Sequence, residues 1–306
     1  MRILLLGLNE PDLINQLTWE NHLVISSGER NENFYEILKI VDGIVLRSPH
    51  CITDDMIELA SSLKFVIRAG SGTDNISSKI FENNIAFLRI PINASAVAEH
   101  VFAMIFSIYR KIPAAHQSLV EGLWQKHHLM GREVNHKKLG IVGFGNIGRR
   151  VAQIGNALDM KILTSDRSIE KKEKQEVLRQ THAEFVPLDN LLSNSDIVVL
   201  CLPLNDSSKH IINSNSLELL QENAVLINVG RGGLIYTEDL LNHLSCHPNV
   251  YAALDVFEKE PPGINISLYP NLLVTPHIGA QTYECRQRIR DVILSKIRMF
   301  VDEEHF

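Results

Sequence analysis

Cysteine is scarce in this sequence, and the few cysteines are far apart. They are Cys51, Cys201, Cys246 and Cys285, and none belongs to a C-x-x-C pair. Disulfide frameworks and structural zinc sites need closely spaced thiols, so the spacing argues against both. We expect reduced thiols in a cytoplasmic protein.

Long hydrophobic runs and an excess of basic residues are also absent. The longest unbroken apolar runs are the length of a strand, whereas a membrane-spanning helix needs about 20 apolar residues. The first apolar run is too short for a signal peptide and favours a buried strand. Lys and Arg number 30 against 36 Asp and Glu, a net charge of -6, which leaves no excess to neutralise nucleic-acid phosphates. We therefore expect neither a membrane nor a nucleic acid as partner.

What is present is enough for about two domains with large cores, because the chain has 306 residues and 45% of them are hydrophobic. Strand-like runs alternate with helical segments, which is typical of an α/β fold with parallel sheets. Strands are expected at residues 3–6, 23–26, 43–46, 65–67, 86–90, 139–142, 161–164, 197–202, 225–229, 251–254 and 272–275. Helices are expected at residues 34–40, 53–61, 94–112, 147–158, 170–180, 216–220, 237–244 and 283–301.

The long helix over residues 94–112 separates two such blocks, and Pro113 closes or kinks it. A polar stretch over residues 116–138 lacks periodicity and predicts a loop with a short helix. Alternating charges over residues 170–176 predict a solvated helix face with mixed-sign pairs. The block boundary is expected near residue 93.

A glycine-rich segment follows the predicted strand 139–142 and opens a helix. It reads Gly143-Phe-Gly145-Asn146-Ile147-Gly148, the G-x-G-x-x-G pattern of dinucleotide-binding turns. In that pattern Gly143 permits the tight turn, Gly145 the close approach of a pyrophosphate, and Gly148 close packing of helix on strand. Asp166 ends the next strand, where an acidic side chain accepts from ribose hydroxyls and repels a 2′-phosphate. The pattern therefore predicts NAD(H), although Arg167 weakens the discrimination against NADP(H).

Three polar side chains follow predicted strands, where open α/β sheets bind their ligands. Arg231 follows the strand at 225–229, Glu260 follows that at 251–254, and His277 follows that at 272–275. Singly, each has an ordinary structural explanation as a turn residue, a loop acid or a helix cap. Together they suggest an anion-binding group and an acid–base pair.

With its other motifs, the chain resembles the D-isomer-specific 2-hydroxyacid dehydrogenases over nearly its whole length. The motifs, in order, are RAGSGTDN (68–75), NASAVAEH (93–100), the glycine segment, NVGRGG (228–233), DVFEKEP (255–261) and PHIGA (276–280). The resemblance implies a flavodoxin-like substrate-binding domain (residues 1–92 and 283–306) and a Rossmann NAD-binding domain (residues 93–282). Both are doubly wound, with a cleft between them. It also implies a homodimer formed through the NAD domain.

Residue roles follow from this resemblance. Arg231 resembles the arginine that grips the substrate carboxylate and carbonyl oxygen, His277 the proton donor to that oxygen, and Glu260 the acid that fixes the imidazole tautomer. Asp255 resembles the residue that receives the nicotinamide carboxamide. Backbone at Ser71 and Gly72 is expected to bind the substrate carboxylate. The cofactor set is Ser71, Gly143, Gly145, Asn146, Ile147, Gly148, Asp166, Leu202, Pro203, Val229, Gly230, Asp255, Gly279 and Ala280. Residues 205–208 depart from the family pattern, which puts one side-chain contact to the cofactor in doubt.

Two further arginines bear on the substrate. Arg47 and Arg68 follow the strands at 43–46 and 65–67, and they match arginines that hold the phosphate in D-3-phosphoglycerate dehydrogenases. The chain is thus most like the catalytic region of those enzymes, and we expect no regulatory domain after residue 306. Glyoxylate and hydroxypyruvate reductases and other D-2-hydroxyacid dehydrogenases share the same catalytic set and remain alternatives. In those, Arg47 and Arg68 pair locally or point to solvent.

A different class stays open at this point. Transcriptional corepressors of this fold use NAD(H) binding as a switch for protein recognition and keep the Arg, Glu and His. No cluster with metal-ligand spacing is evident in the sequence, so we expect hydride transfer without a metal.

Overall fold

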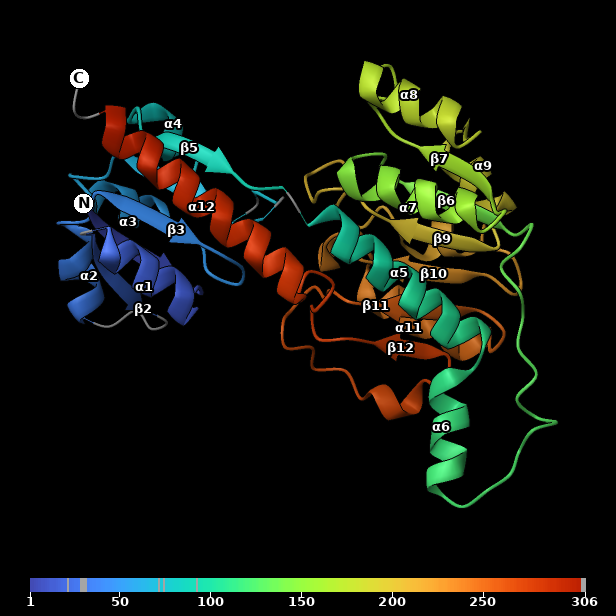
Figure 1. The fold of residues 1–306 in the computed structure, drawn as a ribbon. Helices are drawn as coiled ribbons and strands as arrows, with labels where there is room; N and C mark the ends of the chain where they lie inside the picture. Colours follow the sequence, from blue (N-terminus) through green and yellow to red (C-terminus); the bar gives the residue numbers. More distant parts are fainter. Residues whose placement is uncertain (21, 28–31, 71, 74, 92, 304–306) are drawn as a thin grey trace. The chain divides into compact units, whose positions relative to one another are not determined.

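The computed structural model describes residues 1–20, 22–27, 32–70, 72–73, 75–91 and 93–303. The chain forms two compact units (Figure 1). One comprises Met1–Asn93 and Thr282–Phe306, and the other comprises Ala94–Gln281. Each unit is built on a parallel sheet covered by helices, so the predicted α/β class is confirmed.

The first unit contains a five-stranded parallel sheet in the order β2-β1-β3-β4-β5. Its strands are β1 (Arg2–Leu6), β2 (Leu23–Ser27), β3 (Gly43–Leu46), β4 (Phe65–Arg68) and β5 (Ala86–Arg89). Its helices are α1 (Pro11–Trp19), α2 (Glu32–Leu38), α3 (Asp54–Leu59), α4 (Lys79–Glu82) and α12 (Tyr283–Glu303). This is the flavodoxin-like strand order, whose ligand-binding switch point lies beside β1 and β3.

Both faces of this sheet are buried, as expected for a parallel sheet between helices. On one face Leu4 and Leu6 pack in a cluster with α2, α3 and α4. On the other, Phe65 of β4 stacks on Phe300 of α12 with ring centroids 4.4 Å apart. The last helix is also joined to α1, because Arg290 donates to Asp12 at 2.9 Å. A helix at the C-terminal end therefore completes the layer begun by α1.

The second unit contains a seven-stranded sheet in the order β12-β11-β10-β9-β6-β7-β8, and all pairs are parallel. The strands are β6 (Lys138–Val142), β7 (Lys161–Ser165), β8 (Glu184–Phe185), β9 (Ile197–Leu200), β10 (Val225–Asn228), β11 (Tyr251–Leu254) and β12 (Leu272–Val274). The helices are α5 (Ala94–Tyr109), α6 (Ile112–Val120), α7 (Asn146–Ala157), α8 (Lys172–Gln180), α9 (Leu188–Asn194), α10 (Ser214–Leu217) and α11 (Thr237–Cys246), with short 3-10 turns η1 (Gly232–Leu234) and η2 (Ile266–Leu268).

Successive side chains along the strands of this unit point to opposite faces of the sheet, so the core has two layers. Ile141, Val199 and Ile227 face the cluster that contains α5, α7 and α8. Their neighbours Val142, Val198 and Leu226 face the cluster that contains α9, α10 and α11. The central strand β9 is therefore a continuous apolar run, which is why strands of this kind were recognisable in the sequence.

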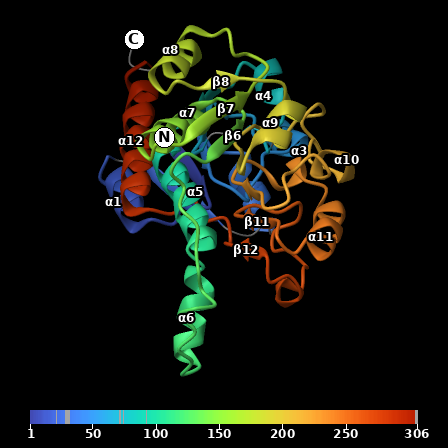
Figure 2. The same cartoon turned by 90° about the vertical axis from the view of Figure 1, so that its right-hand side faces the viewer.

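The structure departs from the predicted elements in several places, and the short helix α4 and the two-residue strand β8 are among the elements that were not predicted. Helices α1 and α9 were not predicted, because each has only two fully buried side chains to signal a period. The predicted helix over residues 94–112 ends at Tyr109 instead, since Lys111 takes a left-handed conformation (φ 51°). Pro113 then lies in the first turn of α6, a position that suits a residue without an N–H. In both views α6 projects from the body of its unit (Figures 1 and 2).

No helix among the described residues is both long and apolar enough to cross a membrane.

Candidate active site

Three neighbouring strands of the second unit deliver the predicted catalytic side chains to one sheet edge. β10, β11 and β12 are adjacent and parallel. Arg231 lies three residues after β10, Glu260 six after β11, and His277 three after β12. Parallel strands end at the same edge, so the sheet brings together residues that are up to 46 positions apart in the chain.

His277 and Glu260 form a direct pair. The Nδ1 atom of His277 lies 2.9 Å from Oε2 of Glu260. With a carboxylate as acceptor, Nδ1 carries the hydrogen and donates it, which leaves Nε2 as the atom that can exchange a proton. Both side chains are partly exposed, at 37% and 33%. The pair is therefore oriented and still accessible to a small molecule.

The loop that carries His277 is held by a buried carboxylate. Asp255, directly after β11, is 2% exposed. Its Oδ1 accepts from Ile278 N (2.8 Å) and Thr275 Oγ1 (2.7 Å), and its Oδ2 accepts from Gly279 N (2.9 Å). Burial alone would raise the pKa of Asp255, but these donors and His100 lower it, so the group stays ionised. Asp255 and Gly279, two of the predicted cofactor-binding residues, thus hold the loop that carries His277 in its conformation.

The turn after β10 places Arg231 beside the loop that carries Glu260. Asn228 donates to the carbonyl of Arg231 (2.9 Å) and accepts from Gly230 N (3.1 Å), which fixes the turn. A Cβ on Gly232 would lie 1.8 Å from the carbonyl carbon of Phe257, so only glycine permits this approach. Arg231 and the Glu260 loop are adjacent because their backbones touch at Gly232.

The glycine segment has the geometry expected of it. Gly143 has a φ of 94°, which L side chains rarely adopt, and a Cβ on Gly148 would lie 2.1 Å from the carbonyl oxygen of Gly143. Around Gly145, in contrast, a Cβ would meet no atom within 4 Å. Gly145 caps α7 without a side chain, so the amides of Asn146 and Ile147 start the helix beside open space. A helix N-terminus of this kind binds anions.

The other predicted cofactor residues surround this turn. A Cβ on Gly143 would lie 2.9 Å from Leu202, and one on Gly230 would lie 2.8 Å from the carbonyl oxygen of Leu202. Pro203 follows, and its carbonyl accepts from Ser208 Oγ (2.7 Å). The segment after β9 therefore lies between the glycine turn and the turn at Val229–Gly230. Ala280 packs against the core cluster of α5 and α7.

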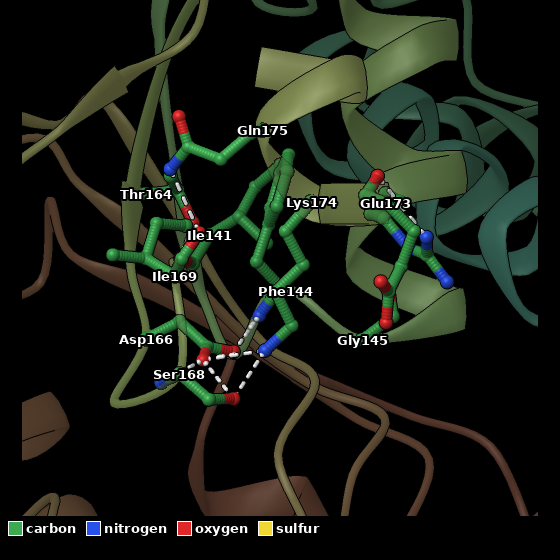
Figure 3. A network of polar contacts seen from close by, with 11 residues as sticks. Ile141, Phe144, Gly145, Thr164, Asp166, Ser168, Ile169, Glu173, Lys174 and Gln175 are labelled. Carbon is green, nitrogen blue, oxygen red and sulfur yellow. Dashed lines mark hydrogen bonds and ion pairs between the residues drawn. The ribbon is translucent and has the colours of Figure 1, made fainter. Parts of the chain in front are cut away.

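Asp166 is the centre of a polar network at the end of β7 (Figure 3). Its Oδ1 accepts from Lys174 Nζ (2.6 Å) and Ser168 N (2.7 Å), and its Oδ2 accepts from Phe144 N (2.6 Å). Burial raises the pKa of Asp166, but these three donors outweigh it and hold the pKa below its ordinary value. Arg167 points elsewhere, to Oδ1 of Asn205 at 3.2 Å.

The predicted substrate residues of the first unit are Arg47, Arg68, Ser71 and Gly72. Arg68 is 3% exposed and donates to Asn75 Oδ1 (3.2 Å), the Ala69 carbonyl (2.9 Å) and Ser48 Oγ (2.8 Å). Arg47, whose side chain is 14% exposed, lies 3.9 Å from Glu10. Burial and the charge of Arg286 lower the pKa of Arg47. Gly72 is half-buried, and Ser71 lies outside the described residues.

Comparison with known proteins identifies the family. Residues 102–279 match the family model described as "D-isomer specific 2-hydroxyacid dehydrogenase, NAD binding domain". The chain belongs to the D-isomer specific 2-hydroxyacid dehydrogenases. It is 38% identical to a hydroxypyruvate reductase of Thermotoga maritima over 280 residues, which cover 90% of this chain and 89% of the relative. It is 35% identical to a D-3-phosphoglycerate dehydrogenase of Synechocystis sp. over 281 residues, 88% of this chain and 50% of the relative.

A solved structure has a similar fold over nearly the whole chain. A glyoxylate reductase of Paecilomyes thermophila superposes with a TM-score of 0.85 at 28% identity, over 97% of this chain and 94% of the other. The chain spans about half the length of the phosphoglycerate dehydrogenases that it matches. As a member of this family the protein is an enzyme, and its second unit contains the family's NAD-binding domain. The corepressor-like alternative is therefore set aside.

The residues present fit NAD in this D-2-hydroxyacid dehydrogenase. A Cβ at position 145 would occupy the open space beside the start of α7, and the glycine leaves that space free for a pyrophosphate. The adjoining Asp166 carboxylate is ionised and lies one strand away. The turn and the acid are thus placed as a dinucleotide requires.

Sequence reasoning missed one residue of this region. Lys174 was expected on a solvated helix face, but its side chain is only 10% exposed and binds Asp166. The prediction for residues 170–176 is wrong at this position, because Lys174, the fifth residue of the run, turns inward toward the end of β7. The sequence signal for this inward position was the apolar pair Val177 and Leu178. They lie three and four residues after Lys174, and they are buried on the inner face of α8.

Proposed function

We propose that the protein interconverts a D-2-hydroxy acid and its 2-keto acid with NAD(H), using His277, Glu260 and Arg231. The observation that carries this is the 2.9 Å pair of His277 with Glu260 beside the Arg231 turn. Bound NAD(H) supplies or accepts the hydride. The chain's own residues supply the proton transfer and the anion binding that the hydride step needs.

His277 is the proton donor in keto-acid reduction and the base in the reverse direction. Nδ1 is committed to Glu260, so Nε2 presents the proton to the carbonyl oxygen of the substrate. Glu260 stabilises the imidazolium and holds the ring in place. Its Oε1 also accepts from Phe257 N at 3.3 Å, so the carboxylate is itself oriented by its loop.

Arg231 binds the substrate carboxylate and carbonyl oxygen. A guanidinium is planar and permanently charged, and it can meet two oxygens at once, which an ammonium group does less well. One of its nitrogens donates to the carbonyl of Gly230 at 2.8 Å, which steadies the side chain.

We assign a preference for NAD(H) over NADP(H) to Asp166. An ionised carboxylate at the end of β7 accepts from ribose hydroxyls and repels a 2′-phosphate. The Nζ atom of Lys174 lies 2.6 Å from Oδ1 of Asp166 and offsets part of that charge. The preference is therefore expected to be moderate rather than absolute.

For the substrate we favour a small unphosphorylated 2-keto acid such as hydroxypyruvate or glyoxylate. Phosphate recognition was predicted from Arg47 and Arg68. Nε, NH1 and NH2 of Arg68 each donate to an oxygen of the surrounding loop, and the side chain is buried. The relative from Thermotoga maritima, which is similar over 90% of this chain, is named a hydroxypyruvate reductase.

D-3-phosphoglycerate remains the second candidate, for one specific reason. Arg47 directly follows β3, and Arg68 is the last residue of the adjacent strand β4. They lie near the switch point of the first unit, where this type of sheet binds ligands. A phosphate could recruit them if Arg68 exchanged its loop partners for phosphate oxygens.

A turnover assay tests the reaction and the substrate together. NADH oxidation is measured with glyoxylate, hydroxypyruvate and 3-phosphohydroxypyruvate, for the wild type and His277→Ala. The variant is expected to lose about 10²–10⁴-fold in kcat, the usual range for general acid–base catalysis, with the dissociation constant for NADH nearly unchanged. Full activity of His277→Ala contradicts the mechanism. A higher kcat/KM for 3-phosphohydroxypyruvate than for hydroxypyruvate contradicts only the substrate choice.

A further inference from the structure

A cluster of potential metal-ligating side chains lies at the C-terminal end of α11, the end away from the η1 turn. His243 lies in the last turn of α11, and His247 follows four residues later as the C-terminal cap of the helix. Glu218 at the end of α10 reaches the same place. One potential ligand atom from each of the three lies within 4.8 Å of the other two. Glu218 is exposed, His247 is half-buried and His243 is buried.

The distances suit a shared ion better than direct hydrogen bonds. Nδ1 of His243 is 3.6 Å from Oε1 of Glu218, which is beyond ordinary hydrogen-bond length. Two ligands bonded to one tetrahedral Zn²⁺ at about 2.0–2.1 Å lie roughly 3.4 Å apart. The observed separation therefore leaves room for a cation between the two groups.

A hydrogen bond decides which nitrogen of His247 is able to bind a metal. Nδ1 of His247 lies 3.0 Å from the carbonyl oxygen of His243, so it donates to that acceptor and leaves Nε2 with a free electron pair. Metal-binding histidines are commonly fixed by such a hydrogen bond from the other ring nitrogen. The two rings stack, with centroids 4.0 Å apart and planes 22° apart. Because the lone pair of an imidazole nitrogen lies in the ring plane, one ring must turn about its side-chain bonds for both to bind one ion.

We propose that Glu218, His243 and His247 bind one divalent transition-metal cation of the Zn²⁺ class. Two imidazoles and a carboxylate suit borderline ions such as Zn²⁺, and not Mg²⁺ or Ca²⁺, which take oxygen ligands. Three protein ligands leave a position for water. The sequence carries a His-x-x-x-His spacing at 243–247, which places His247 just past the end of α11 and close to His243.

This site is separate from hydride transfer. The first residue of α11, Thr237, is tied to Glu258 in the loop that carries Glu260. His243 lies six residues further on, about 9 Å along the axis at 1.5 Å per residue. The cation would join the ends of α10 and α11, whose Leu217 and Leu240 pack in one core cluster. It is therefore expected to stabilise the fold and not to take part in the reaction.

Zinc titration of the intact, chelator-treated protein tests the site. Isothermal calorimetry with Zn²⁺ is expected to give one site that His247→Gln and Glu218→Gln each weaken by at least about tenfold. Loss of an outer hydrogen-bond partner already costs 10–100-fold, and these variants remove direct ligands. The controls His116→Gln and Glu222→Gln change exposed groups of the same unit and are expected to leave that affinity unchanged.

Cys246 provides a sharper control because it is exposed and lies between the two histidines. Cys246→Ser is expected to keep the affinity, and bound Co²⁺ is expected to show d–d bands without thiolate charge-transfer absorption. Loss of the site in Cys246→Ser contradicts the proposed ligand set. Unchanged affinity in both His247→Gln and Glu218→Gln, or no zinc binding by the wild type, overturns the proposal.

Discussion

The backbone of His277 adopts a left-handed conformation, with a φ of 53°. A non-glycine residue there costs of order 1–3 kcal/mol, and surrounding contacts must hold it. Asp255 supplies those contacts through the N–H groups of Ile278 and Gly279. The geometry of the proposed proton donor thus depends on a carboxylate that is buried one strand away.

Glu260→Gln tests how Glu260 acts, because it keeps the shape and removes the charge. A carboxylate stabilises the neighbouring imidazolium, and reduction requires protonated His277. The alkaline limb of the kcat profile for keto-acid reduction is therefore expected to move to lower pH in Glu260→Gln. The measurement is kcat against pH under saturating NADH.

A nearby acid gives the matched control for this experiment. Glu258 lies two residues away and binds Thr237 and His210 instead of His277. Glu258→Gln is expected to alter thermal stability and leave the alkaline limb in place. If Glu260→Gln shows the wild-type limb, Glu260 has no electrostatic role in the proton transfer.

At the scale of elements, the β7–α8 connection shows how a helix modifies a binding position. The end of β7 supplies Asp166, and the inner face of α8 supplies Lys174 (Figure 3). A surface ion pair contributes little, but these side chains are only 12% and 10% exposed. The ammonium group therefore lowers the negative potential that a 2′-phosphate would meet.

Lys174→Met is expected to make the enzyme more selective for NADH. The variant keeps an unbranched side chain and leaves the charge of Asp166 uncompensated, so the ratio of NADPH to NADH dissociation constants should rise by roughly 3–10-fold. Asp166→Ala is expected to weaken NADH binding and to bring the ratio of the NADPH to NADH dissociation constants closer to one. Fluorescence titration with NADH and with NADPH measures this ratio. Lys172→Met, on the exposed face of α8, is the control. An unchanged ratio in Lys174→Met removes Lys174 from cofactor selection.

At the scale of the whole molecule, exposed apolar side chains gather on and after α6. We call this set the α6 patch: Ile112, Leu119, Val120, Leu123, Trp124 and Met130, each at least 43% exposed. Exposed apolar side chains that are close together in the chain mark candidate interaction sites. Helix α6 projects from the body of the second unit (Figure 2), and the family resemblance implies a homodimer formed through this unit, so we propose a second copy of the chain as the partner.

Light scattering after size exclusion is expected to give about twice the chain mass of 34.5 kDa. The double variant Leu119→Ser and Trp124→Ser removes two large apolar contacts of the patch and is expected to shift the protein toward the monomer. Trp19→Ser changes an equally exposed tryptophan of the first unit and should leave the mass unchanged. A monomeric wild type, or a double variant that stays dimeric, contradicts an α6 interface.

Much of the fold could be predicted because buried parallel strands are continuous apolar runs. Ile197–Leu200 and Val225–Asn228 are examples, buried throughout. The glycine turn was equally clear, since the conformations at Gly143 and Gly148 exclude other residues. Helices α1 and α9 were missed because short helices with two buried residues carry little periodic signal.

The sequence by itself determined the chemical groups and the family, because motifs such as the glycine turn and the His277 loop are local in the chain. Only the tertiary structure decided what those groups touch. Arg68 donates to oxygens of its own loop and of the loop after β3, Lys174 turns toward Asp166, and Glu218 lies close to two histidines at the end of α11. Such contacts join residues that are distant in sequence or depend on which helix face turns inward. They are fixed by the packing of helices on a sheet, which no local pattern records.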